Sequence, residues 1–312
     1  EKVINPSYLS LSKDQKIIYS VNENGVESAV SSFEFDKASG ILTNLNQQKS
    51  QGADPCYLIN DDLNVIVANY SGGNIAVFRK KTDGSLTEAK QLVQHKGKGI
   101  HPRQESAHVH MLYFSPDKKY VLSTDLGTDS IDIYEYHPDA ANEVLQWKSS
   151  VAVQSGSGPR HLTFSKDGKK VYVLQELNGA ISVFDYANGK LNKIQETTIL
   201  SKDFKGNFTG ADIHISPDGK FLYASNRGEA NTISIFKILK NGQLHPLSVV
   251  SSLGKGPRNF VIDPTGKFLL VAHQYSNDIV VFKRDLSSGA ISDTGKRIEL
   301  CSPVCLVFGN QK

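Results

Sequence analysis

Two arginines in this sequence each follow a Gly-Pro dipeptide: Arg160 in Gly158-Pro159-Arg160 and Arg258 in Gly256-Pro257-Arg258. We expect each turn to present its guanidinium at the entrance of the strand that follows. A pair of guanidiniums suits a carboxylate, a phosphate or a developing oxyanion, because their N–H donors match two acceptor oxygens at once. The alternative is that each arginine pairs with a local carboxylate or caps a loop carbonyl. The recurrence at one register favours a functional role.

A His-x-His pair, His108-Val109-His110, is a second candidate for chemistry. In a strand, these two histidines point to the same face. They would suit a metal, but no third ligand is identifiable and nearby arginines would repel a cation. We therefore predict no metal and no cofactor, and general acid/base work for one of the two. The alternative is a packed, hydrogen-bonded histidine.

Two carboxylates accompany these residues. Glu176 lies sixteen residues beyond Arg160, and among several arginines it would orient a histidine, hold a water or simply neutralise charge. Asp125 stands in Asp125-Leu126-Gly127-Thr128-Asp129. A turn residue that accepts hydrogen bonds from loop amides is the slightly favoured interpretation of Asp125, and substrate binding is the other.

These residues lie within an internal repeat, whose clearest copy is GPRHLTFSKDGKKVYVLQELNGAISVFDYANGKL from Gly158. Each copy has an apolar strand, a turn such as Ser-Pro-Asp-Gly-Lys, a second apolar strand and an alternating third strand. The apolar residues before the turns, used here as anchors, are Leu11, Ile59, Phe114, Phe164, Ile215 and Ile262. Their spacings of 48, 55, 50, 51 and 47 residues, with room for a fourth strand, match the blades of a β-propeller. No segment shows a convincing helical stripe, so the class is all-β.

Equivalent positions in the repeat diverge where a structural repeat would keep similar residues. Four residues before the anchors stand Ser7, Pro55, His110, Arg160, Ala211 and Arg258. Twelve residues after the anchors stand Glu23, Ser71, Leu126, Glu176, Arg227 and Gln274, and one position earlier stand Asn22, Tyr70, Asp125, Gln175, Asn226 and His273. Polar, charge-mixed residues at a shared level of a propeller predict a small-molecule site at its centre.

The chain ends on the start of a seventh copy, Ser302 to Phe308. We therefore expect a single domain over residues 1–312, a seven-bladed propeller whose closing blade is shared between the chain ends. Glu1 to Asn5 is too short to supply the other strands of that blade, so roughly 40 residues are expected before Glu1 from the repeat length. A six-bladed ring with a tail is the alternative.

Composition and charge exclude only a few classes of protein, namely those that bind nucleic acids or membranes. The 312 residues carry a net charge of +3 and contain no apolar run of 18 residues, so we expect neither nucleic acid nor membrane as a partner. Three cysteines are too few for a disulfide framework and fit the cytoplasm, while a start without Met leaves the periplasm open. We expect a monomer or a weak dimer. The polar insertion Gln94 to Ser106, which contains Arg103, is the candidate lid.

Several of these motifs, taken in order, resemble the propeller-type lactonases. They are Arg103-Gln104, His108-Val109-His110, Ser115-Pro116-Asp117, Asp125-Leu126-Gly127-Thr128-Asp129, Gly158-Pro159-Arg160-His161, Ser225-Asn226-Arg227-Gly228 and Gly256-Pro257-Arg258. That family holds the bacterial 6-phosphogluconolactonases and the fungal carboxymuconate lactonising enzymes, and the resemblance covers essentially the whole chain. It implies seven blades, and catalytic roles for His110 (or His108), Arg160, Glu176 and Arg258.

The hypothesis that follows is a lactonase for a phosphorylated sugar lactone such as 6-phosphogluconolactone, in the pentose phosphate route. His110 would be the general base for the attacking water, and Glu176 would orient His110 or the water. Arg160 or Arg258 would stabilise the oxyanion, and the other arginine or Arg227 would hold the phosphate. The further residues predicted to bind substrate are His108, Arg103, Asp125, Arg227, Asn226 and His273.

Two alternatives remain at this point. A cycloisomerase of carboxylated muconates would use the same residues, because carboxylate and phosphate both favour arginine. A non-catalytic propeller that binds proteins or glycans would instead carry exposed aromatic side chains on one outer face. The one tryptophan, Trp147, is expected in a loop and supports that alternative weakly.

Overall fold

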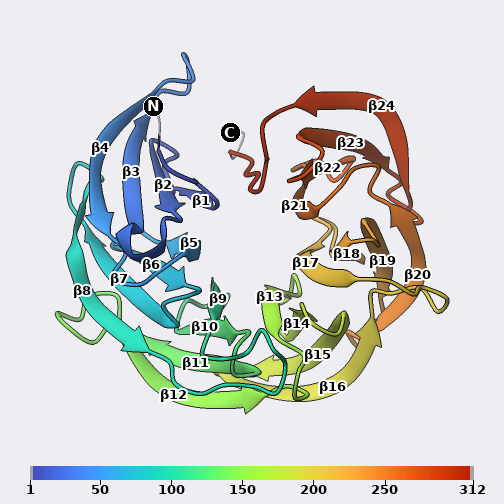
Figure 1. Ribbon diagram of the computed structural model, residues 1–312, viewed down its shortest axis with the longest axis horizontal. Helices are drawn as coiled ribbons and strands as arrows, with labels where there is room; N and C mark the ends of the chain where they lie inside the picture. The colour runs from blue at the N-terminus through green and yellow to red at the C-terminus, as the bar shows by residue number, and fades with distance from the viewer. Residues whose placement is uncertain (1–2, 310–312) are drawn as a thin grey trace. The chain divides into compact units, whose positions relative to one another are not determined.

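The computed structural model describes residues 3–309, which divide into two compact units. The N-terminal unit comprises residues 3–156 with Gly309, and the C-terminal unit comprises residues 157–308. Each unit contains three four-stranded antiparallel sheets in which consecutive strands are neighbours (Figure 1). The repeat therefore predicted the content of the sheets correctly, including a fourth strand in every copy.

The first sheet of the N-terminal unit contains β1 (Leu9–Leu11), β2 (Ile17–Asn22), β3 (Ala29–Phe35) and β4 (Leu42–Lys49). The second contains β5 (Pro55–Asn60), β6 (Asn64–Asn69), β7 (Asn74–Lys80) and β8 (Leu86–Gln94). The third contains β9 (Val109–Phe114), β10 (Tyr120–Asp125), β11 (Ser130–Tyr136) and β12 (Leu145–Ala152). A short 3-10 turn, η1 (Gly25–Glu27), is the only helical segment within residues 3–309.

The C-terminal unit repeats this arrangement. Its first sheet contains β13 (Pro159–Phe164), β14 (Lys170–Gln175), β15 (Ala180–Ala187) and β16 (Lys190–Thr198). Its second contains β17 (Phe208–Ile215), β18 (Phe221–Gly228), β19 (Thr232–Ile238) and β20 (Leu244–Ser251). Its third contains β21 (Pro257–Ile262), β22 (Phe268–His273), β23 (Asp278–Arg284) and β24 (Ile291–Glu299).

A Ser-x-Asp turn closes the first hairpin by local hydrogen bonding in four of the six sheets within residues 3–309, at Ser12, Ser115, Ser165 and Ser216. Between β13 and β14, Asp167 Oδ1 accepts hydrogen bonds from Ser165 Oγ at 2.6 Å and from Lys169 N at 3.1 Å. Gly168 adopts a φ of 70°, which a residue with a side chain rarely takes. This chemistry sets the hairpin register, and the register places each anchor residue in the first strand of its sheet, as the repeat predicted.

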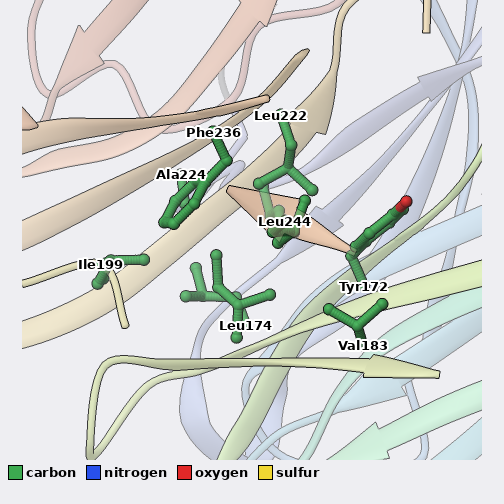
Figure 2. Close-up of a cluster of buried hydrophobic side chains, with 10 residues drawn as sticks. Tyr172, Leu174, Val183, Ile199, Leu222, Ala224, Phe236 and Leu244 are labelled. Carbon is green, nitrogen blue, oxygen red and sulfur yellow. The ribbon is translucent and has the colours of Figure 1, made fainter. Parts of the chain in front are cut away.

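Apolar side chains from neighbouring sheets interlock to form the core of each unit. In the C-terminal unit, Tyr172, Leu174 and Val183 meet Leu222, Ala224, Phe236 and Leu244 of the next sheet (Figure 2). The hydroxyl of Tyr172 donates to Gly242 O at 2.9 Å, so this buried polar atom is paired. Burial of each large apolar side chain stabilises the fold by about 1.5–3 kcal/mol. This packing also brings first strands together, since β13 contacts β17 and β17 contacts β21.

Two expectations were wrong. The strand predicted over Ser302 to Phe308 is not formed: residues 303–309 belong to no strand, and no strand within residues 3–309 lies alongside them to form a ladder. Leu306 N instead donates to the side chain of Asn259 at 2.7 Å. Trp147 lies in β12 rather than in a loop, with 61% of its surface exposed.

Candidate functional site

Three of the predicted catalytic residues occupy β-bulges in the first strand of their sheet. The neighbours of Arg160 in β13 pair with two consecutive residues of β14, so Arg160 is the extra residue of the bulge. The same holds for Arg258 in β21 and for His110 in β9. A bulge bends the strand and redirects the extra side chain, and bulges are over-represented beside active sites. The shared register of these residues therefore reflects a shared backbone feature.

In the C-terminal unit, a single carboxylate bridges two buried arginines. Glu176, which directly follows β14, places Oε2 2.9 Å from Arg160 Nε and Oε1 3.1 Å from Arg227 Nη2. Arg227 Nη2 also donates to Gly210 O at 3.2 Å, and Arg160 Nη1 donates to Ala211 O. The structure thus brings together three of the predicted residues through direct ion pairs.

Burial and neighbouring charges act on Arg160 together. The side chain is only 2% exposed. Burial, followed by repulsion from Arg227, lowers the pKa of Arg160 to about 9, although the Glu176 carboxylate opposes that shift. Arg160 is therefore still a cation at neutral pH, held in a poorly solvated place. A cation of this kind interacts strongly with any anion that reaches it, because water screens it weakly.

Arg258 completes what we call the arginine cluster, which consists of Arg160, Glu176, Arg227 and Arg258. Its charge is close enough to contribute to the lowered pKa of Arg160. Arg258 is half-buried and has no ion-pair partner among residues 3–309. The cluster accordingly holds three guanidiniums and one carboxylate, and within residues 3–309 Arg258 is its cation without an ion-pair partner.

A second polar network, which the sequence did not predict, adjoins Arg160. Asp212 in β17 accepts from His161 Nδ1 at 2.8 Å, from His214 Nε2 at 2.9 Å and from Asn259 Nδ2 at 2.6 Å. The other ring nitrogen of His161, Nε2, lies 3.1 Å from Arg160 Nη1. This network therefore links the first strands of all three sheets in the C-terminal unit to Arg160.

Neighbouring groups determine the protonation states of Asp212 and His161 in this network. Burial raises the pKa of the Asp212 carboxyl, but His214 and the hydrogen bonds from both histidines outweigh it and hold the pKa well below its usual range. Burial lowers the pKa of His214, but Asp212 outweighs that effect and the net pKa is raised. Burial and the Arg160 charge lower the pKa of His161 to about 4. Near neutral pH, Asp212 is thus an anion and His161 is neutral.

The two remaining predicted residues of this unit lie at the ends of second strands. Asn226 is fully buried, and neither atom of its amide has a hydrogen-bond partner among the described residues. His273 is fully buried 3.0 Å from Asp278, and burial lowers its pKa. His273 thus contacts Asp278, and its role in substrate binding stays a prediction.

In the N-terminal unit, the two histidines share one aromatic neighbour. His108 stacks on Tyr70 with ring centroids 4.5 Å apart, and His110 meets the same ring edge-on at 5.5 Å. Both side chains are buried, 5% and 4% exposed. Both rings therefore contact one side chain, but His108 precedes β9 and His110 is the extra residue of its bulge, so their placement on one strand face stays a prediction. Tyr70 stands at one of the equivalent positions of the repeat, but its role beside the histidines was not predicted.

Asp125 serves the turn that follows β10. Its Oδ1 accepts from the backbone amides of His108 at 2.8 Å, Gly127 at 2.9 Å and Thr128 at 3.2 Å. Its Oδ2 lies 2.8 Å from His95 Nδ1. These contacts match the turn interpretation, and they give Asp125 a positioning role at the start of the His-x-His segment. Direct substrate binding by Asp125 stays a prediction.

The insertion Gln94 to Ser106 is attached to the unit at both ends. His95 reaches Tyr134 Oη at 2.7 Å, and the buried Gln104 donates to Leu126 O at 2.8 Å. Between them the segment is largely exposed, and Arg103 Nη2 lies 3.4 Å from Tyr70 Oη. Arg103 therefore lies beside the ring that both histidines contact, while its binding of substrate stays a prediction.

The candidate residues thus form two groups, each described within its own unit. His108, His110, Arg103 and Asp125 belong to the N-terminal unit, and Arg160, Glu176, Arg227, Arg258, Asn226 and His273 belong to the C-terminal unit. Sequence reasoning missed Tyr70, His95, Asp212 and His214 as members of these groups. Asp212 had a usable signal, because His161, Asp212 and Asn259 all stand three residues before their anchors.

Repeated four-stranded antiparallel sheets with polar bulges on their first strands define an all-β protein of the propeller class. The chain belongs to the lactonase family described as a seven-bladed β-propeller, whose model matches residues 1–308. It is therefore a hydrolase that acts on the ester bond of a lactone.

Relatives with names or solved structures cover nearly the whole chain. The 6-phosphogluconolactonase of Bacillus subtilis is 35% identical over 99% of this chain and 89% of its own length. A Bacteroides fragilis protein provisionally named 6-phosphogluconolactonase has a crystal structure with a TM-score of 0.95 and 44% identity, over 99% of this chain and 88% of that one. The periplasmic gluconolactonase of Pseudomonas aeruginosa has a TM-score of 0.91 and 37% identity, over 96% and 86%.

Within the described residues, no helix has the length and apolar character needed to span a membrane.

Proposed function

We propose that this chain hydrolyses 6-phosphogluconolactone and so acts in the pentose phosphate route. The names of the Bacillus subtilis and Bacteroides fragilis relatives support this substrate. The observation that carries the proposal is the arginine cluster, in which Glu176 offsets part of the charge of Arg160 and Arg227 while Arg258 has no ion-pair partner among residues 3–309. A phosphate monoester supplies the anion that this excess of guanidinium favours.

The proposed roles follow from these contacts. Arg258, which is half-buried and has no ion-pair partner in the described part of the chain, holds the phosphate. Arg160 is fixed by Glu176 and by Ala211 O and stabilises the negative charge that develops on the carbonyl oxygen during attack by water. A preorganised donor of this kind contributes about 10²–10³-fold to the rate. Glu176 keeps both buried arginines charged and in place.

Hydrolysis also needs a base to take the proton from water, and we propose His110 for it. His110 is buried against Tyr70 on a β-bulge, so its ring is held in one orientation. Positioned proton transfer contributes about 10²–10⁴-fold. His108 is the other candidate; its Nδ1 is 3.1 Å from Tyr70 O and its Nε2 is 3.3 Å from Glu105, and it lies before β9 rather than on the bulge. The variants His110→Gln and His108→Gln should differ accordingly, with the larger loss of kcat at His110.

The first test compares two lactones that differ only in the phosphate. Hydrolysis of 6-phosphogluconolactone and of glucono-δ-lactone is followed in a pH-indicator assay and corrected for the spontaneous rate. Wild type should prefer the phosphorylated lactone, and Arg258→Ala should lower kcat/KM for it at least tenfold while changing the plain lactone much less. Arg297→Ala is the matched control, since Arg297 is exposed and pairs with Asp293 outside the cluster. Equal losses on both lactones would contradict the phosphate role of Arg258.

The same hydrolysis assays, extended to other lactones, also test the two alternative functions. Turnover of carboxymuconate-type lactones alone would support the cycloisomerase, because the arginine cluster suits carboxylates as well. No turnover of any lactone by the folded protein would support a binding scaffold and refute the proposal.

We also propose that the chain forms a single seven-bladed propeller domain. The family description supports seven blades, and six sheets lie within residues 3–309. A crystal structure of the protein would count the blades directly, and a closed six-bladed ring would contradict the proposal. The predicted compartment remains the cytoplasm or the periplasm. The predicted monomer or weak dimer can be tested by analytical sedimentation.

A further inference from the structure

The guanidinium of Arg160 lies at one end of a hydrogen-bonded chain that crosses the C-terminal unit. The chain runs from Asn259 in β21 to Asp212 in β17, from Asp212 to His161 in β13, and from His161 Nε2 to Arg160 Nη1. Asp212 also accepts from the amides of Ile213 at 3.0 Å and Phe260 at 3.3 Å. Its carboxylate is therefore fully occupied, and it belongs to the framework of the fold.

The order of donors along this chain fixes the state of His161. An ionised Asp212 accepts only, so His161 Nδ1 carries the proton in their contact. The guanidinium of Arg160 donates only, so His161 Nε2 must present its lone pair to Nη1. Both demands are met by one form of the ring, the neutral tautomer with its proton on Nδ1. A protonated ring would place a second N–H against the guanidinium.

His214 is the second histidine on Asp212, and against the opposing effect of burial the carboxylate raises the pKa of its ring. Its Nε2 lies 2.9 Å from Asp212 Oδ2, on the other oxygen from His161. The two histidines thus bind the two oxygens of one carboxylate. Only His161 continues from Asp212 to Arg160, so His214 is the contact that can be removed without touching the guanidinium.

We propose that His161, held by Asp212, is a positioning residue that orients the Arg160 guanidinium for the reaction. The proposal rests on the proposed function of Arg160 as the group that stabilises the oxyanion. His161 would act through Arg160 and need not touch substrate, because its two ring nitrogens contact Arg160 and Asp212. An oxyanion donor is effective only when its N–H groups are already aimed at the developing charge, and a misplacement near 1 Å costs on the order of 10²-fold in rate.

Two substitutions at His161 separate its two contacts. Glutamine reaches as far as Nε2, so His161→Gln keeps an acceptor for Arg160 and loses the contact with Asp212. Asparagine reaches only as far as Nδ1, so His161→Asn keeps the contact with Asp212 and loses the acceptor. His161→Asn should lower kcat for lactone hydrolysis about tenfold to a hundredfold with little change in KM. His161→Gln should retain kcat within about threefold.

The matched control is His214→Asn, which also removes a contact with Asp212 but none with Arg160. It should lower the thermal midpoint about as much as the His161 variants and leave kcat within about twofold. Equal kcat losses in His214→Asn and His161→Asn would show that the network acts only through stability, and the proposal would be wrong. Wild-type kcat in a folded His161→Asn would refute it as well.

A readout without substrate keeps the two proposals distinguishable. In ¹⁵N NMR of the imidazoles at pH 7, His161 should appear as a neutral ring protonated on Nδ1, and His161→Asn should broaden or shift the Arg160 Nε–H signal. An imidazolium, or a proton on Nε2, would overturn the proposal even if the enzyme is active. If wild type hydrolyses no lactone while this spectrum is observed, the proposed function fails and the orientation of Arg160 by His161 stands.

Discussion

Replacement of Glu176 by glutamine tests the central electrostatic feature of the C-terminal unit. The carboxylate contacts Arg160 at 2.9 Å and Arg227 at 3.1 Å, and these arginines are only 2% and 9% exposed. Glutamine keeps the shape of the side chain and removes its charge. Two buried guanidiniums then face each other without the carboxylate that neutralises them.

The size of the effect follows from burial. Removal of one partner of a buried ion pair typically costs about 3–5 kcal/mol, because the other charge stays desolvated and uncompensated. A glutamine carbonyl can still accept from one arginine, which recovers about 1 kcal/mol. We therefore expect Glu176→Gln to lower the free energy of unfolding by about 3 kcal/mol. The pKa of Arg160 should also fall below about 9, since Glu176 contributes more than Asp212 to raising it.

The assay is urea unfolding at pH 7, followed by circular dichroism and tryptophan fluorescence. Glu135→Gln is the matched control, because it removes the same charge from a partly exposed pair with Lys148. That control should leave the unfolding midpoint within error. A loss below about 1 kcal/mol in Glu176→Gln would refute the reasoning. It would mean that water reaches the two arginines.

Two further predictions concern backbone space and pH. Gly127→Ala should destabilise the N-terminal unit by more than about 2 kcal/mol in the same unfolding assay. The reason is that a Cβ at this position would lie 1.8 Å from Ser106 O and 2.8 Å from His108 N. An unchanged unfolding midpoint would contradict this close approach of the backbones. Since burial lowers the pKa of His161 from 6.5 to about 4, only the unfolded chain takes up this proton as the pH falls between those values. Wild type should therefore lose stability relative to His161→Gln by about 1.4 kcal/mol per pH unit across that window, whereas a difference independent of pH would show that His161 titrates normally.

The sequence alone determined the repeat and, through it, which residues share a level in the fold. Anchors spaced by about one blade length placed Leu11, Ile59, Phe114, Phe164, Ile215 and Ile262 in first strands, and the structure confirms each one. Glu176 and Arg227 stand at equivalent positions of the repeat, and the structure shows that they form a direct ion pair. Such positions are predictable because every copy of a repeat meets its neighbours in the same way.

The tertiary structure decided how those residues are paired. Nothing in the local sequence marks Arg160 or Arg258 as the extra residue of a bulge, since a bulge exists only in the pairing of two strands. Asp212 likewise reads as an ordinary polar residue in a strand, until packing of neighbouring sheets brings His161 and Asn259 onto its two oxygens, beside His214 of its own strand. The local sequence determines the type of each side chain and its position within the blade. Its hydrogen-bond partner, and so its charge state and orientation, comes from chain segments about fifty residues away.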